Sequence, residues 1–203
     1  LAGDGLRQIL WGVTKKIVIS DTIAVTTTTI FIDIPNQDAP TLVLGAFLYT
    51  LQLYTDFSGY SDIAIGLGKL LGFKVIKNFN FPLFAQNIAD FWRRWHISLT
   101  SWLTEYVFTP LSINFRDYGK WGLMLAIVLN FLLIGMWHGP NWTYVLFGFL
   151  HGIYYIPLIL SGKMNKKKKF KKDVVFPSIK EFFNISRTFV LVMFTFVVFK
   201  VES

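Results

Sequence analysis

The sequence has 203 residues, of which 53% are hydrophobic and 16% are charged, and its mean hydropathy is +0.48. About a quarter of the residues are charged in an ordinary soluble domain, so this composition excludes one. Several long apolar segments instead predict a helical protein that crosses a membrane repeatedly. The net charge of +8 comes mostly from a few basic clusters, which indicates membrane orientation and no nucleic-acid surface. Because the chain has no cysteine, disulfides, thiolate metal sites and a cysteine acyl-enzyme are excluded.

The first part of the chain contains two apolar segments joined by a linker. Residues 5–16 form a short amphipathic lead-in, and residues 17–32 form an apolar segment of marginal length for a membrane span. The linker, residues 33–40, contains two prolines and two aspartates and no basic residue, so it is expected to form turns. A second apolar segment covers residues 41–54.

Two carboxylates, Asp56 and Asp62, follow the second apolar segment. On one continuous helix they would point to different faces, whereas a helix break at Gly59 would bring them together. Two interpretations stay open: they are polar residues at a helix break, or they support a functional site. The next helical stretch, residues 63–71, ends at Gly72, which is a suitable helix C-cap.

Residues 87–107 are predicted to form one amphipathic helix with Asn87 as its N-cap. Asp90 and Arg94 lie on its polar stripe at i, i+4 spacing, where they can pair. His96 lies on the opposite, apolar face, so its imidazole is expected in an apolar setting. Because this helix is too polar to face lipid along its length, we expect it at the membrane surface or inside the bundle. Residues 110–118 are expected to form a loop.

The most informative stretch joins two apolar segments, residues 121–137 and 141–160. Each is long enough to cross a hydrocarbon core about 30 Å thick. Pro140 lacks an N–H group and disfavours α geometry at Gly139, so the backbone must break there. We therefore expect a helical hairpin that carries His138 at its tip. The tip also carries Trp137, Asn141 and Trp142, and an interfacial aromatic belt with a histidine beside it would by itself account for the two tryptophans.

Basic residues recur on alternate connections of the chain. The densest cluster is residues 163–172, which contain seven lysines. Placing the basic connections in the cytoplasm puts the acidic linker and the His138 tip on the opposite side of the membrane.

Three motifs occur in order along the chain: Asp56–Ala64, Asp90–Leu99 and Gly135–Trp142. Together they resemble the membrane-bound O-acyltransferase (MBOAT) family, in particular its bacterial alginate O-acetyltransferase branch. The D-alanyl transfer protein of teichoic acid synthesis is a near relative of that branch. The resemblance covers nearly the whole chain, so residues 1–203 are interpreted as a partial MBOAT membrane domain without the family's amino-terminal helices. One departure is Pro140, where the family more often has a small residue.

The resemblance implies an all-α fold: a polytopic integral membrane helical bundle with re-entrant or interfacial helices, in the bacterial inner membrane. It implies an O-acyltransferase in which His138 is catalytic and His96 is its companion. The resemblance further implies that no cofactor is tightly bound and that the acyl donor, acetyl-CoA or an acyl carrier, is a substrate. The expected acceptor is a cell-surface polysaccharide such as alginate, or its carrier. Extracytoplasmic acyltransferases are expected as partner proteins beside the lipid bilayer.

The chemistry of the residues agrees with this implication. A neutral imidazole near pH 7 is suited to take the proton of an attacking hydroxyl. The oxyanion that then forms needs hydrogen-bond donors, and the residues near the tip are candidates for this role and for substrate binding: Asn141, Trp137 and Trp142. Four charged residues are expected to support the site: Asp56, Asp62, Asp90 and Arg94.

Three alternatives stay open. In the first alternative the protein is still an O-acyltransferase, but it transfers D-alanyl groups to teichoic acid. In a second class the protein is a membrane transporter, although the chain shows no internal repeat. In a third class the protein is a metalloenzyme whose ligands are His96, His138 and His151 with Asp56 or Asp90. The histidines are spaced far more widely than in short metal-binding motifs, so no metal is expected. His151 is interpreted as a packing residue that is hydrogen-bonded within the bundle.

Overall fold

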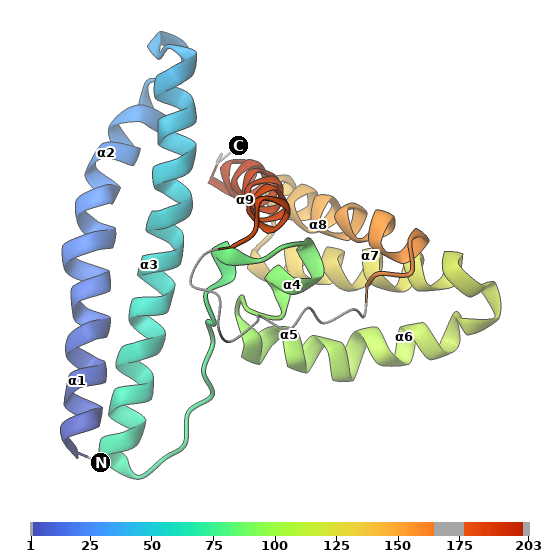
Figure 1. The fold of residues 1–203 in the computed structure, drawn as a ribbon, viewed down its shortest axis with the longest axis horizontal. Coiled ribbons are helices and arrows are strands. Elements are labelled where there is room, and N and C mark those ends of the chain that lie inside the picture. The colour runs from blue at the N-terminus through green and yellow to red at the C-terminus, as the bar shows by residue number, and fades with distance from the viewer. Residues whose placement is uncertain (1, 165–176, 201–203) are drawn as a thin grey trace. The chain divides into compact units, whose positions relative to one another are not determined.

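The structure is a computed structural model, and it describes residues 2–164 and 177–200 (Figure 1). Within these residues the chain forms helices and turns and no strand, so the all-α prediction is confirmed. The chain divides into two compact units, Leu1–Phe79 and Asn80–Ser203. Most of the predicted basic cluster, from residue 165 onward, lies outside the described residues.

The first unit is a long antiparallel helical pair (Figure 1). One arm consists of α1 (Ala2–Val13), a π-helical segment (Thr14–Ser20) and α2 (Asp21–Ile32), and the other arm is α3 (Ala39–Leu71). The linker between the arms contains a short 3₁₀ turn, Ile34–Asn36, as expected from its turn-forming composition. The Asp38 carboxylate caps α3 by accepting a hydrogen bond from the Thr41 N–H at 2.9 Å. Gly72, with φ +81°, ends α3, as predicted.

Two pairs of glycines bring the arms of the first unit into backbone contact. Gly5 lies opposite Gly66, and Gly12 lies opposite Gly59. A Cβ atom on Gly12 would lie 2.6 Å from the Gly59 carbonyl oxygen, so no larger residue fits without separating the helices. The seven-residue spacing in both helices places each pair on the same face, two turns apart.

The expected break at Gly59 is wrong, because α3 is continuous from Ala39 to Leu71. A glycine inside a helix costs only about 1 kcal/mol relative to alanine, and the close packing of α1 on Gly59 outweighs this cost. The two carboxylates therefore do not meet at a helix break. Asp56 and Asp62 flank Gly59 on either side and pair with successive lysines of the π-helical segment.

The second unit contains the remaining helices. They are α4 (Ile88–Trp92), α5 (Ile97–Leu103), a π-helical segment (Thr104–Phe108), α6 (Thr109–Asn114), α7 (Gly119–His138), α8 (Trp142–Leu160) and α9 (Ile179–Lys200), with 3₁₀ turns at Pro82–Phe84 and Arg116–Tyr118. The helices α7 and α8 form an antiparallel hairpin (Figure 1). Three helices among the described residues are long and apolar enough to cross a membrane: Arg116–His138, Trp142–Leu160 and Ile179–Lys200.

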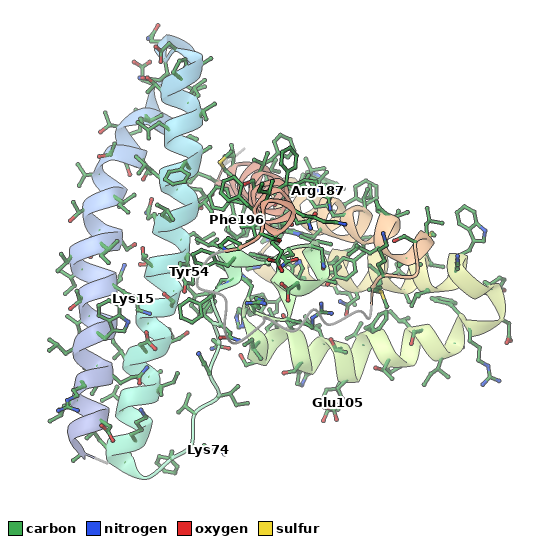
Figure 2. All side chains as sticks on the ribbon, viewed as in Figure 1. Lys15, Tyr54, Lys74, Glu105, Arg187 and Phe196 are labelled. Atoms are coloured by element: carbon green, nitrogen blue, oxygen red, sulfur yellow. The ribbon has the colours of Figure 1, made fainter. Side chains whose placement is uncertain are left out.

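The core of the second unit is aromatic. Phe196 of α9 is almost fully buried, whereas Glu105 is exposed and points away from the unit (Figure 2). Phe91 of α4 stacks on Trp95 with a ring-centroid distance of 5.4 Å, and Trp95 packs on Phe196 at 5.1 Å. These contacts fix the short helix α4 against α9.

The single helix expected over residues 87–107 is interrupted, so that prediction is wrong in its length. Asn87 is the N-cap, as predicted, and its Oδ1 accepts a hydrogen bond from the Asp90 N–H at 2.8 Å. The helix then stops at Trp92, and a second one starts after His96, whose φ of 43° is left-handed. The Arg94 carbonyl, which loses its helical partner at this break, accepts from the Asn80 N–H at 2.9 Å.

The loop expected over residues 110–118 is also mostly helical. Pro110 lies in the first turn of α6. The preceding turn is π-helical, and the Thr109 hydroxyl donates to the Thr104 carbonyl at 2.7 Å. The wider π turn accommodates a residue that lacks an N–H group, so the helix continues past the proline.

Candidate active site

The hairpin tip is formed by a backbone break between α7 and α8. The helix α7 ends at His138, and Gly139 has φ 147° and ψ 175°, which favours glycine. The Asn141 side chain caps α8, because its Oδ1 accepts a hydrogen bond from the Thr143 N–H at 3.0 Å. The predicted break at Gly139–Pro140 and the place of His138 at its edge are therefore confirmed.

The His138 ring lies among aromatic side chains yet belongs to an exposed residue. Its centroid is 4.9 Å from that of Phe199 at the end of α9 and 4.9 Å from that of Trp137. Phe147 and Tyr144 of α8 lie at 5.9 and 6.0 Å. These rings hold the imidazole in place on one side, and the exposed side is accessible to a reactant.

His96 lies in the turn between α4 and α5, where its left-handed backbone is unusual for a residue with a side chain. Such strained positions persist where the surrounding structure enforces them, often at active sites. Its Nδ1 lies 3.5 Å from the Ser98 Oγ. Burial lowers the pKa of His96 below its usual value of 6.5, so the imidazole is neutral near pH 7. The apolar setting predicted for His96 is confirmed, although the turn provides it and not a helical face.

Trp137 brings the two candidate catalytic histidines together. Its indole ring meets the His96 ring edge to face at 6.3 Å and the His138 ring at 4.9 Å. Residues 42 positions apart in the chain thus contact the same indole ring and share one site.

Asp90 and Arg94 fix the turn that carries His96. The Arg94 Nε donates to the Asp90 Oδ1 at 3.0 Å, so the predicted pair is present. The other carboxylate oxygen accepts from the Gln86 N–H at 3.2 Å. Both side chains are largely buried, so this pair holds the start of α4 to the turn at its end. The two residues therefore support the position of His96.

Asp56 and Asp62 belong to the first unit, where they form ion pairs. Asp62 pairs with Lys15 and also accepts a hydrogen bond from Gln8 Nε2 at 2.6 Å. Asp56 pairs with Lys16, which also contacts Asp21. In this unit the two aspartates therefore hold α1 and the π-helical segment against α3.

His151, the third histidine, is fully buried. It hydrogen-bonds to Trp92 and Thr195 at 3.2 Å each, so its interpretation as a hydrogen-bonded packing residue is confirmed. The described residues, which include all three histidines, contain no cluster of His, Cys, Asp and Glu side chains that would hold a metal ion.

The tip is flanked by exposed indoles and by aromatic residues that the sequence motifs did not indicate. Trp142 is 83% exposed and Trp137 is 62% exposed, so both present a ring face outside the protein core. Phe199 and Tyr144 lie outside the three motifs, and no pattern in the sequence marked them. Their ring contacts with His138 become visible only when α7, α8 and α9 are packed together.

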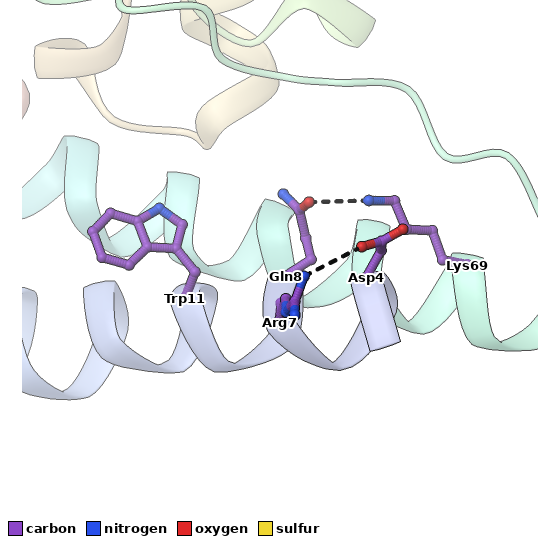
Figure 3. A pocket seen from close by; sticks show the side chains of 5 residues that line it. All are labelled: Asp4, Arg7, Gln8, Trp11 and Lys69. Atoms are coloured by element: carbon purple, nitrogen blue, oxygen red, sulfur yellow. Dashed lines mark hydrogen bonds and ion pairs between the residues drawn. The ribbon is translucent and has the colours of Figure 1, made fainter. Parts of the chain in front are cut away.

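The structure contains two pockets of note among the described residues. One belongs to the first unit and is lined by Asp4, Arg7, Gln8, Trp11 and Lys69 (Figure 3). Its polar groups are already engaged, since Lys69 donates to Gln8 at 3.1 Å and Arg7 pairs with Asp4 at 3.9 Å. The other belongs to the second unit and lies between the elements that carry His96 and His138.

Comparison with known proteins identifies the family. Residues 5–199 match the model of the MBOAT, membrane-bound O-acyltransferase family. The chain belongs to this family. The family and the apolar helices together show a membrane protein.

Individual relatives agree with this assignment. The chain is 39% identical over 201 residues to the probable alginate O-acetylase AlgI of Pseudomonas putida. The aligned region covers 98% of this chain and 39% of the relative. It is 42% identical over 154 residues to the peptidoglycan O-acetyltransferase of Helicobacter pylori, covering 73% of this chain and 28% of the relative. It is 36% identical over 137 residues to the teichoic acid D-alanyltransferase of Bacillus subtilis, and this aligned region covers 63% of this chain and 34% of the relative. The chain thus spans about two fifths or less of the length of these relatives.

Proposed function

We propose that the protein is an O-acyltransferase of the bacterial inner membrane that transfers an acetyl group to hydroxyl groups of an exported cell-surface polysaccharide. The observation that carries this proposal is the pair of histidines that both contact the Trp137 ring, one of them at an exposed helix end. The relatives named alginate O-acetylase and peptidoglycan O-acetyltransferase support acetyl as the acyl group and a glycan polymer as the acceptor.

His138 is the general base in this proposal. An alcohol is a poor nucleophile, and a neutral imidazole that takes its proton during attack on the acyl carbonyl accelerates the transfer by about 10²–10⁴-fold. His138 lies at a backbone break where its exposed side can meet a hydroxyl. After collapse of the tetrahedral intermediate, the same imidazolium returns its proton to the leaving group of the donor.

His96 assists without replacing His138. Its half-buried ring and its position in a strained turn suit the orientation of a reactant or of the acyl donor. Asn141 is a candidate for stabilising the oxyanion through its Nδ2 amide, because its Oδ1 caps α8 and so fixes the side chain. An indole N–H of Trp137 or Trp142 is a suitable alternative donor.

The test is acetyl transfer by the reconstituted membrane protein, measured per mole of inserted protein. We expect His138→Gln to insert normally and to lose transfer by at least about 10²-fold, and His96→Gln to lose less or to bind donor more weakly. Near-normal transfer by His138→Gln beside an inactive His96→Gln would reverse the roles. Faster transfer of D-alanyl than of acetyl from matched thioester donors would assign the protein to the D-alanyl class.

A further inference from the structure

The pocket of the first unit lies beside the start of α1 and the end of α3 (Figure 3). Its volume is about 360 Å³, which is within the range of about 300–1,000 Å³ that is typical of small-molecule sites. Four of its lining residues come from α1, and Lys69 comes from α3. Because Arg7 and Lys69 are basic and only Asp4 is acidic, the lining residues carry a net charge of +1.

Lys69 differs in its partner from the lysines farther along the helical pair. Lys15 and Lys16 each pair with a carboxylate of α3. Among the described residues no carboxylate pairs with Lys69, whose ammonium donates to the neutral Gln8 Oε1 at 3.1 Å. The Gln8 Nε2 donates in turn to the Asp62 Oδ1 at 2.6 Å, so the amide is fixed from both sides. This arrangement holds the ammonium at the pocket without neutralising its charge, and its other N–H groups are available to a ligand.

Arg7 and Trp11 provide further donors one turn apart on the same face of α1. The Arg7 side chain is 86% exposed, and its contact with Asp4 is 3.9 Å long, so this ion pair contributes little. Within the described part of the chain the indole N–H of Trp11, an exposed residue, has no hydrogen-bond partner. Guanidinium, ammonium and indole N–H groups donate and do not accept. The pocket therefore suits an anion, and a guanidinium matches the geometry of a phosphate.

Exposed apolar side chains lie at the same end of the first unit as this pocket. Five of them are more than half exposed: Leu6, Leu10, Leu71, Phe73 and Ile76. Lys74 and Lys77 are exposed in the segment that follows α3, and Lys74 extends from this end (Figure 2). Basic residues beside exposed Leu, Phe and Trp are typical of a surface that lies on an anionic membrane. A soluble phosphate compound would require no such apolar surroundings, so the ligand indicated is a lipid.

We propose that this pocket binds the phosphate headgroup of an anionic phospholipid and holds this end of the first unit at the membrane surface. Arg7 and Lys69 contact the phosphate, and Trp11 donates its indole N–H while its ring lies among the upper parts of the acyl chains. The basic connections were placed in the cytoplasm, so the lipid belongs to the cytoplasmic leaflet. The proposal is independent of the proposed acyltransferase function, because neither candidate catalytic histidine takes part.

The test is lipid binding by the purified protein, freed of bound lipid and measured by native mass spectrometry. Phosphatidylglycerol, which is anionic, and phosphatidylcholine, which has no net charge, are titrated with identical acyl chains, so that only the headgroup differs. One basic residue near an anionic surface contributes about fivefold in affinity, so two contribute about 25-fold. We expect the wild type to prefer phosphatidylglycerol by about 25-fold and Arg7→Gln/Lys69→Gln to lose this preference, with phosphatidylcholine binding unchanged.

The matched control is Arg116→Gln/Lys120→Gln, which removes two positive charges from exposed positions of the second unit and should keep the preference. Lys69→Arg, which keeps the charge, should also keep it. If the double variant at the pocket does not fold, Arg7→Gln alone, at an exposed side chain, should still lose about fivefold.

Three outcomes would overturn the proposal. The first is equal affinity of the wild type for the two lipids. The second is an equal loss of phosphatidylglycerol binding in Arg7→Gln/Lys69→Gln and in the control variant, which would show an effect of overall charge and not of this pocket. The third is displacement of phosphatidylglycerol by millimolar glycerol phosphate, which would assign the pocket to a soluble phosphate compound.

Discussion

The indole N–H of Trp92 donates a hydrogen bond to Nδ1 of His151 at 3.2 Å. An indole nitrogen is only a donor, so Nδ1 accepts and the imidazole carries its proton on Nε2. That N–H donates to the Thr195 Oγ1, also at 3.2 Å, and the Thr195 hydroxyl donates to the Val192 carbonyl at 2.9 Å. One neutral, buried ring therefore joins α4, α8 and α9.

This series of hydrogen bonds from Trp92 through His151 to Thr195 is expected to position the site as well as to stabilise the fold. Trp92 comes directly before the turn that carries His96, and Phe147 packs on both His151 and His138. His151→Leu leaves the buried Trp92 N–H unpaired at about 1–3 kcal/mol and removes the hydrogen bond to Thr195, so we expect a lower melting temperature and reduced acetyl transfer. His151→Gln, which can both accept and donate, should recover part of each loss.

Trp92→Phe tests the same series of hydrogen bonds at its Trp92 end. It removes the donor and keeps most of the ring, so it should lower kcat while the exposed matched variant Trp102→Phe does not. A wild-type melting temperature and a wild-type kcat in His151→Leu would contradict the positioning role.

The two ion pairs of the first unit are expected to differ in their contribution to stability. The side chains of Lys15 and Asp62 are 13% and 17% exposed, whereas those of Lys16 and Asp56 are 43% and 42% exposed. Removing one partner of a buried pair costs about 3–5 kcal/mol, and exposed pairs contribute about 0–1 kcal/mol. Lys15→Leu should therefore reduce the amount of folded protein in membranes strongly, and Lys16→Leu weakly. The double variant Lys15→Leu/Asp62→Leu should recover stability, and equal losses in both single variants would refute the ranking.

Gly135 is expected to tolerate no side chain, because it sets the distance between α7 and α8 one turn from His138. A Cβ atom there would lie 2.2 Å from the Tyr144 carbonyl oxygen, which is part of a helix backbone and cannot move alone. Gly135→Ala should displace α7 from α8 near the tip and reduce acetyl transfer by more than about tenfold, since small displacements of catalytic groups are costly. Gly3→Ala, where the added atom meets nothing within 4 Å, is the control for the same change. Normal transfer by Gly135→Ala would mean that the tip adjusts to the wider spacing.

The titration of His96 should make stability depend on pH. Burial lowers the pKa of this group in the folded protein below its usual 6.5, so the unfolded chain binds the proton more readily. The stability contributed by neutral His96 is therefore complete above pH 6.5 and is lost as the pH falls through the lowered folded-state pKa. Between about pH 7.5 and about pH 5, the melting temperature of the wild type should fall further than that of His96→Gln. Identical pH dependence in the two proteins would show that His96 is solvated in the folded state.

Much of the fold and of the candidate site was predictable from local properties of the sequence. Pro140 lacks an N–H group and disfavours α geometry at the preceding Gly139, so the hairpin tip and the position of His138 were predicted from the chain itself. The cap at Asn87, the terminator at Gly72 and the Asp90–Arg94 pair depend on residues within four positions of one another. Such short-range interactions are the same in an isolated peptide and in a folded protein.

At Gly59 and at the turn before His96, only the tertiary structure decided whether a helix continued or stopped. Gly59 was expected to break α3 and does not, because α1 packs against it and favours the continuous helix. The segment 87–107 was expected to be continuous and is interrupted, because Asn80 satisfies the freed carbonyl of Arg94 from a distant part of the sequence. The contact of both His96 and His138 with Trp137 likewise depends on residues that the chain separates by tens of positions. Local propensities differ by only about 1 kcal/mol, so packing between remote segments outweighs them wherever the two disagree.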